Sequence, residues 1–215
     1  MLECLLFDMD GLLIDSDPLQ FGAYRKAFAE FGYDLDIGAW TRWHEVEASC
    51  ARFVAENNIG VDAAEVRARK KELYDRLIEE ELVLKPGASK LVEDCATEFR
   101  LALVSGSRLE SIQACLEKFG LLQHFDVLVS GADQKRSKPY PDAYLAGMQR
   151  LDTSPKHAIA LEDSPSGFRA AVAADLRCLV CPDDFRHGDP EAFEGAALIV
   201  SSLEEVDPDL LRGLL

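Results

Sequence analysis

The chain has 215 residues with a hydrophobic fraction of 48%, and its 23 lysines and arginines against 39 aspartates and glutamates give a formal net charge of -16. A negative surface field repels phosphate backbones and anionic lipid headgroups, so we expect neither nucleic acid nor a membrane as a partner. No apolar run approaches the roughly 20 residues that cross a bilayer, and the six cysteines lie mainly in apolar stretches, as in a reducing compartment. A cytoplasmic location is expected.

Short apolar runs predict a set of strands, and from the second strand onward these alternate with helical patterns. The strands are expected at Cys4–Phe7, Leu101–Val104, Val127–Val129, Ala158–Leu161, Cys178–Val180 and Ala197–Val200. The helices are expected at Ala88–Glu98, Leu109–Phe119, Ala143–Leu151 and Ser166–Ala174, with a short terminal helix from Leu203. This alternation favours an α/β fold, a Rossmann-like doubly wound parallel sheet between layers of helices.

The stretch from residue 15 to residue 84 interrupts this rhythm, because it shows helical periodicity and no credible strand. Helices are expected there over Leu19–Phe31, Val46–Asn57 and Ala63–Leu82. We therefore predict an all-helical domain over 15–84, inserted into an α/β core of residues 1–14 and 85–215. Asp17 is expected to cap its first helix, with Pro18 at the first helical position and Gln20 completing a capping box.

Two aspartates follow the first predicted strand, at the point where the chain enters a loop. Asp8 and Asp10 are two residues apart, so in an extended backbone their side chains share a face and converge. Two carboxylates that close repel each other unless a cation, a shared proton or a division of labour relieves the repulsion. A metal ion is the expected relief, and a metal beside a free carboxylate indicates a reaction centre.

The next two strands lead into segments that suit an anion. Ser105, Gly106 and Ser107 follow the second strand, where a hydroxyl, a glycine that permits close approach and the free N–H groups of a helix start form an anion cradle. Taken alone, such a segment is more often ordinary turn chemistry. After the third strand, Lys138 lies in a loop stiffened by two prolines, where a cation can neutralise a phosphoryl oxygen.

A second acidic pair, Glu162 and Asp163, follows the fourth strand. Ser164 is expected to cap the next helix, which Pro165 opens, and this leaves both carboxylates to face the cleft. Oxygen ligands from two strands, with solvent in the remaining positions, are what Mg²⁺ prefers. The four strand ends together therefore indicate a magnesium site with anion-binding groups around it.

These motifs together resemble those of the haloacid dehalogenase-like hydrolases, in the branch of phosphatases and β-phosphoglucomutases with a helical cap. The segment Phe7–Ser16 is similar to the family's first motif almost throughout. Ser105, Lys138 with Pro139, and Glu162–Ser164 match its second, third and fourth motifs in order. The resemblance covers nearly the whole chain, and it implies a Mg²⁺-dependent enzyme that hydrolyses a small phosphorylated metabolite, such as a sugar phosphate.

The resemblance also implies a role for each of these residues. Asp8 would attack phosphorus to form an aspartyl-phosphate, while Asp10 would act first as general acid and then as general base. Magnesium would be bound by Asp8, Asp163 and the backbone carbonyl of Asp10, with Glu162 holding a metal-bound water. The oxygens of the transferring phosphoryl group would be held by Ser105, the amide of Gly106 and Lys138.

The helical insertion would act as a lid that excludes water and contacts the leaving group. Its tip is expected at 40–47, where Arg42 and His44 can meet a hydroxylated or anionic leaving group, although a surface arginine and histidine are more often only solvated. Relatives usually carry a glycine-containing loop there, and this chain does not. Gln20 stands where related β-phosphoglucomutases have a histidine, which counts against a mutase.

The sequence also leaves alternative functions to consider. A β-phosphoglucomutase-like phosphotransferase would pass the phosphoryl group to a second hydroxyl instead of to water. A phospho-acceptor signalling switch would bind Mg²⁺ and accept a phosphoryl group without turnover, but receiver domains of that kind lack a lid. A dehalogenase would use Asp8 without a metal, and this would leave the other acidic residues at the strand ends without a purpose.

Overall fold

The computed structural model describes residues 1–45, 49–183, 185 and 190–215, and the chain divides into two compact units. The first unit holds the described residues of Met1–Ile14, Leu84–Asp184 and Gly188–Leu215. The second holds those of Asp15–Val83 and Phe185–His187. None of the helices in the described part of the chain combines the length and the apolar character needed to span a bilayer.

The first unit is built on a six-stranded sheet in the order β3-β2-β1-β4-β5-β6, and all its pairings are parallel. Its strands are β1 (Cys4–Phe7), β2 (Arg100–Ser105), β3 (Val127–Ser130), β4 (Ala158–Glu162), β5 (Arg177–Val180) and β6 (Leu198–Ile199). Because β1 pairs with both β2 and β4, the strand order reverses at β1, and open α/β sheets bind ligands at such a switch point. The predicted doubly wound parallel sheet is confirmed.

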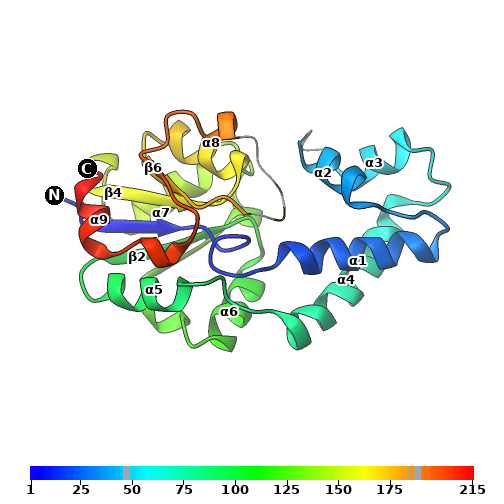
Figure 1. Cartoon of the computed structure of the whole chain (residues 1–215), viewed down its shortest axis with the longest axis horizontal. Helices are drawn as coiled ribbons and strands as arrows, with labels where there is room; N and C mark the ends of the chain where they lie inside the picture. Colours follow the sequence, from blue (N-terminus) through cyan, green and yellow to red (C-terminus); the bar gives the residue numbers. More distant parts are fainter. Residues whose placement is uncertain (46–48, 184, 186–189) are drawn as a thin grey trace. The chain divides into compact units, whose positions relative to one another are not determined.

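Helices cover both faces of this sheet, which explains why its central strands are continuous apolar runs. On one face, Leu6 of β1 and Val104 of β2 share an apolar cluster with Tyr144 of α7 and Phe168 of α8. On the other face, α5 contacts β2 and α6 contacts β3, and Figure 1 shows α5 and α6 on the side of the sheet away from α8. The helices are α5 (Ala88–Ala96), α6 (Leu109–Lys118), α7 (Asp142–Arg150) and α8 (Pro165–Ala173).

The helix that follows β4 begins as the sequence predicts. The Ser164 side chain accepts a hydrogen bond from the Gly167 N–H at 3.1 Å, and Pro165 stands at the first helical position. The terminal helix differs from its prediction, because Leu203–Glu205 forms only a 3₁₀ turn and α9 (Pro208–Gly213) follows it. The reason is a second cap, since Asp207 precedes a proline and accepts from the Leu210 N–H at 2.8 Å.

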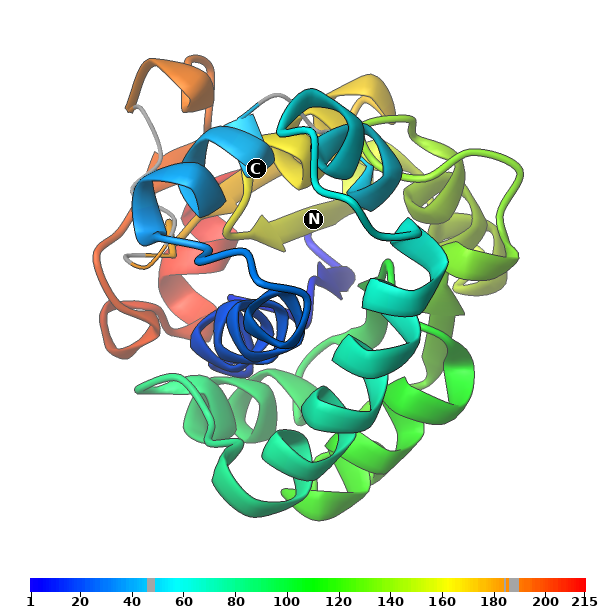
Figure 2. The same cartoon turned by 90° about the vertical axis from the view of Figure 1, so that its right-hand side faces the viewer.

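All regular elements described between residues 15 and 83 are helices: α1 (Asp17–Glu30), α2 (Ile37–Glu45), α3 (Cys50–Glu56) and α4 (Ala63–Glu81). Helices α1 and α4 contact each other (Figure 1), and α1 is seen nearly end-on in Figure 2. Aromatic rings fill the apolar cluster of this unit, and those of Trp43 and Phe53 stack with their centroids 4.6 Å apart.

The helices of the helical unit differ from the predicted ones at three points. The predicted helix over 46–57 begins only at Cys50, because the Ser49 side chain caps it by accepting from the Arg52 N–H at 3.2 Å; residues 46–48 lie outside the described part. Helix α2 covers much of the segment expected as a lid tip. Asp17 is the first helical residue and not the cap, because Ser16 already has right-handed helical dihedral angles, and the Gln20 N–H donates to the Ser16 carbonyl at 2.9 Å.

Candidate active site

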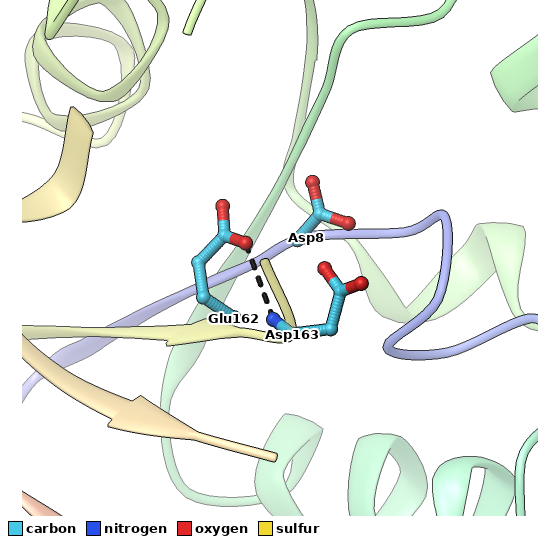
Figure 3. A group of neighbouring side chains, drawn as sticks. All are labelled: Asp8, Glu162 and Asp163. Atoms are coloured by element: carbon cyan, nitrogen blue, oxygen red, sulfur yellow. Dashed lines mark hydrogen bonds between the residues drawn. The ribbon is translucent and has the colours of Figure 1, made fainter. Parts of the chain in front are cut away.

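Three carboxylates meet where β1 and β4 end. Asp8 directly follows β1, and its N–H donates to the Leu161 carbonyl at 3.0 Å, which continues the pairing of the two strands. Glu162 is the last residue of β4, and Asp163 follows it. One carboxylate oxygen from each of Asp8, Glu162 and Asp163 lies within 4.8 Å of the others, and all three residues are buried (Figure 3). The register of two neighbouring strands therefore assembles this acidic group from residues far apart in sequence.

Lys138 links two of these carboxylates. Its Nζ donates to Asp8 Oδ1 at 2.5 Å, to Glu162 Oε1 at 2.6 Å and to the Val104 carbonyl at 3.0 Å. An ammonium group has three N–H donors, so these three acceptors use them all. Burial lowers the pKa of Lys138, but the charges of Asp8 and Glu162 more than offset this and raise it above its usual value. The lysine is therefore a fixed cation between the two acids.

Burial and three neighbouring charges together set the pKa of Asp8. Burial, together with the negative charges of Glu162 and Asp10, outweighs the lowering effect of Lys138 and raises the pKa of Asp8 to about 7. A carboxylate in this position is ionised most readily when an additional cation lies beside it. The acidic group offers such a cation oxygen ligands only, which is the donor set of a hard divalent ion such as Mg²⁺.

Asp10 is oriented by hydroxyl groups. Its Oδ2 accepts from Ser105 Oγ at 3.0 Å and from Ser107 Oγ at 3.1 Å, and Ser105 Oγ in turn accepts from the Ser107 N–H at 3.0 Å. The Asp10 carboxylate is thus not part of the described acidic group around Asp8. Ser107 was not selected from the sequence, although it lies in the predicted anion cradle. Gly106, between the two serines, is exposed, and a Cβ on it would meet no atom within 4 Å.

Two glycines leave room for the carboxylates. Gly11 has a φ of +90°, and a Cβ built on it would lie 2.2 Å from Oδ2 of Asp163. Gly167, in α8, would place a Cβ 2.0 Å from Oε1 of Glu162. Real Cβ atoms do not approach oxygen so closely, so the present positions of both carboxylates require glycine at these two sites.

A second, partly buried ion pair lies in the same unit. Asp183 follows β5 and is 2% exposed, and its Oδ2 accepts from Lys85 Nζ at 3.1 Å. The same oxygen would be 3.5 Å from a Cβ on Gly11, so Asp183 borders the Asp8–Asp163 region. Sequence reasoning did not select either residue. The only sequence signal for Asp183 was that it is one more acidic residue shortly after a predicted strand.

The structure describes the side-chain surroundings of two of the three candidates from the helical unit. Gln20, on α1, is half-buried, and its Oε1 accepts from Lys70 Nζ at 3.3 Å. Lys70 Nζ also lies 3.9 Å from the ring centroid of Tyr74. Arg42 is exposed on α2. His44 belongs to the same helix, and its side chain lies outside the described part of the structure.

Fold and site define a class of protein. Residues 5–181 match the family model described as haloacid dehalogenase-like hydrolase. The chain therefore belongs to this family, in its phosphatase branch, and it is an enzyme of the hydrolase class. The resemblance predicted from the sequence motifs is confirmed.

Individual relatives cover almost the whole chain. It is 33% identical over 220 residues to protein CbbY of Cereibacter sphaeroides, which covers 96% of this chain and 94% of that protein. It is also 33% identical over 221 residues to hexitol phosphatase B of Escherichia coli strain K12, with 97% and 96% covered. A crystal structure of a CbbY mutant from Rhodobacter sphaeroides in complex with xylulose-(1,5)bisphosphate matches with a TM-score of 0.80 at 30% identity, and covers 95% of this chain and 96% of that one.

Proposed function

We propose that the chain is a Mg²⁺-dependent phosphomonoesterase that hydrolyses a small phosphorylated sugar through an aspartyl-phosphate on Asp8. One observation carries this proposal: the buried Asp8 carboxylate lies within 4.8 Å of the carboxylates of Glu162 and Asp163 and accepts from Lys138 at 2.5 Å. A carboxylate that attacks phosphorus needs positive charge beside itself and beside the phosphoryl group, because the transition state is rich in negative charge. The acidic group and the lysine meet this need together.

The sugar substrate is proposed from the relatives. One is a hexitol phosphatase, another is a phosphorylated carbohydrates phosphatase, and a third is a structure with xylulose-(1,5)bisphosphate bound. A net charge of -16 disfavours a polyanionic macromolecule and supports a small substrate held by local donors. We propose accordingly that the enzyme acts in the cytoplasm and binds neither nucleic acid nor membranes.

The metal would be held by Asp8, Asp163 and the backbone carbonyl of Asp10, with Glu162 holding a metal-bound water. When bound, Mg²⁺ would supply positive charge beside the reacting oxygens and so reduce their repulsion from Asp8. The donor set of buried carboxylates fits this ion. Phosphate-binding groups are proposed to be Ser105, the amide of Gly106 and Lys138.

The remaining chemistry belongs to the side chains of the chain itself. A carboxylate oxygen of Asp8 forms the new bond to phosphorus, and the bond from phosphorus to the leaving oxygen breaks. Asp10 gives a proton to that oxygen and later takes one from the water that cleaves the aspartyl-phosphate. The hydroxyls of Ser105 and Ser107 lie 3.0 and 3.1 Å from Asp10 Oδ2, and when Ser105 turns its single proton to the phosphoryl group, Ser107 holds the Asp10 carboxyl group in one orientation for both proton transfers.

The helical unit of residues 15–84 is proposed to serve as a lid and to choose the leaving group. Arg42, Gln20 and His44 stay the candidates for this choice. Support comes from the polar surroundings of Gln20, whose side chain accepts from Lys70 at 3.3 Å within the unit. A lid that excludes water protects the aspartyl-phosphate until the leaving group has departed.

The experiment is phosphate release from p-nitrophenyl phosphate and from a panel of sugar phosphates, with and without Mg²⁺. We expect activity that needs Mg²⁺ and is lost in Asp8→Asn and in Asp10→Asn. Asp75→Asn, at an exposed aspartate of α4 paired with Lys71, is the matched control and should keep full activity. Covalent labelling without turnover would replace the proposal by a signalling switch, and isomerisation of a sugar phosphate without release would replace it by a mutase.

A further inference from the structure

Tyr144 touches both members of the Lys138–Glu162 pair. It lies on α7 and is completely buried. Its hydroxyl donates to Glu162 Oε1 at 2.6 Å, and the Lys138 ammonium lies 5.0 Å from the centroid of its ring. A cation at that distance from a ring face is attracted by its negative charge density. One aromatic side chain therefore contacts the acid with its polar end and the cation with its apolar body.

The hydrogen-bond donors around Glu162 explain why the Tyr144 hydroxyl matters. Oε1 receives two donors, Lys138 Nζ at 2.6 Å and the Tyr144 hydroxyl at 2.6 Å. Oε2 accepts from the Asp163 N–H at 3.2 Å and from the Ser164 hydroxyl at 3.4 Å. A Cβ on Gly167 would come within 2.0 Å of Oε1, so the backbone of α8 closes that side. The carboxylate is thus confined by sterics and by two donors on a single oxygen.

The acceptors around Lys138 also show why a second donor to Glu162 is needed. All three N–H groups already have acceptors, so binding a phosphoryl oxygen requires that the lysine redirect one of them. A buried carboxylate that had the lysine as its sole donor at Oε1 would hold that cation more tightly. A second, neutral donor on Oε1 weakens the hold of Glu162 on Lys138, so that a phosphoryl oxygen can compete for the lysine.

We propose that Tyr144 is a positioning residue whose hydroxyl shares the charge of Glu162, so that Lys138 stays directed at Asp8 and at a phosphoryl group bound there. The inference rests on the proposed function for the role of Lys138. An ionised carboxylate can only accept hydrogen bonds, so the Tyr144 hydroxyl, 2.6 Å from Glu162 Oε1, is the donor of this bond. A purely structural tyrosine would need only its ring, since that ring alone fills the core.

Tyr144→Phe separates the two roles, because it removes the hydroxyl and keeps the ring. We expect kcat for p-nitrophenyl phosphate to fall about tenfold, while KM stays within about twofold. Without substrate, we expect the Kd for Mg²⁺ from isothermal titration calorimetry to rise about tenfold, because Glu162 loses one of its orienting donors. Tyr33→Phe is the control, since the Tyr33 hydroxyl donates to Asn57 in the helical unit, and it should change neither value.

A double-mutant cycle tests whether Tyr144 acts through Glu162. In a Glu162→Gln background, Tyr144→Phe should lower kcat less than about twofold further, because the acceptor it serves has lost its charge. Equal effects in both backgrounds, or a Tyr144→Phe protein with unchanged kcat and unchanged Kd for Mg²⁺, would overturn the inference. Absence of phosphate release by the unmodified enzyme would instead overturn the proposed function, and the Mg²⁺ titration would still decide the role of Tyr144.

Discussion

Lys138 and Asp8 are 130 positions apart in the sequence, and the Lys138 ammonium donates to Asp8 Oδ1 at 2.5 Å. The side chains are 12% and 9% exposed, so this pair is shielded from solvent. Glu162, completely buried, accepts from the same ammonium. The energetic consequences of this arrangement differ from those of the surface pairs elsewhere in the chain, because buried charges lose far more hydration than exposed ones.

Replacing Lys138 by methionine should abolish most activity and destabilise the protein. The change leaves Asp8 and Glu162 without their shared cation, and removing one member of a buried ion pair costs about 3–5 kcal/mol. We expect kcat to fall at least about a hundredfold, as for the loss of a group that stabilises developing charge. The measurements are steady-state phosphate release and urea unfolding. Lys135→Met, at an exposed lysine three residues earlier, should behave like the unmodified protein; equal losses in both would contradict this account.

Gly11→Ala should disturb Asp163 specifically. The new Cβ would lie 2.2 Å from Asp163 Oδ2, in a residue whose φ is +90°. We expect an increase of at least about tenfold in the Mg²⁺ concentration that gives half-maximal activity, and a loss of about 1–3 kcal/mol in stability from the strained backbone. Gly120→Ala is the matched control, because Gly120 has a φ of +67° and its Cβ would meet nothing within 4 Å. That variant should lose stability without any change in metal dependence. An unchanged Mg²⁺ requirement in Gly11→Ala would show that Mg²⁺ binding does not depend on the present position of the Asp163 carboxylate.

Lys85→Met should reduce stability while the fold is kept. The Asp183 side chain is fully buried and the Lys85 side chain is 21% exposed, and they form an ion pair at 3.1 Å. Partial exposure of the lysine reduces the expected loss to about 2 kcal/mol, measured as the free energy of unfolding in urea. Lys90→Met, at an exposed lysine that pairs with Asp94 one helical turn away, should leave the free energy of unfolding nearly unchanged. The interpretation fails if the two variants are equally stable.

The buried thiols should make the protein less stable in alkaline solution. Burial raises the pKa of Cys95 to about 12 and that of Cys115 to about 11. In the unfolded chain a thiol ionises near pH 8.5, so above that pH the unfolded state loses protons that the folded state retains. The sign is therefore a falling stability as pH rises, by about 1.4 kcal/mol per pH unit for each such thiol up to its folded pKa.

Urea unfolding at pH 8, 9 and 10 measures this slope. Cys95→Ala should be less stable at pH 8, because it leaves a small cavity, yet its stability should fall less steeply with pH than that of the unmodified protein. The difference between the two slopes is the quantity of interest, since it does not depend on the cavity. Parallel slopes would contradict a raised pKa for Cys95.

Much of the site follows from where strands end. Asp8 and Glu162 could be assigned to one edge of the sheet because their strands are short apolar runs with clear ends, and parallel strands end at a common edge. The direction of the Asp10 side chain could not be assigned in this way. It depends on two hydroxyls that follow another strand, and a residue spacing of two says nothing about a backbone that has already left the strand.

The sequence by itself determined the alternation of strands and helices in the α/β core, the family of the protein and the set of acids at the strand ends. These are properties of local pattern, because burial on two faces and helix capping leave marks on neighbouring residues. Only the tertiary structure decided that Tyr144 bonds to Glu162, that Lys85 pairs with Asp183 and that Gly11 makes room for Asp163. Each of these depends on contacts between segments distant in the chain, where distance and direction in space matter and sequence spacing carries no information.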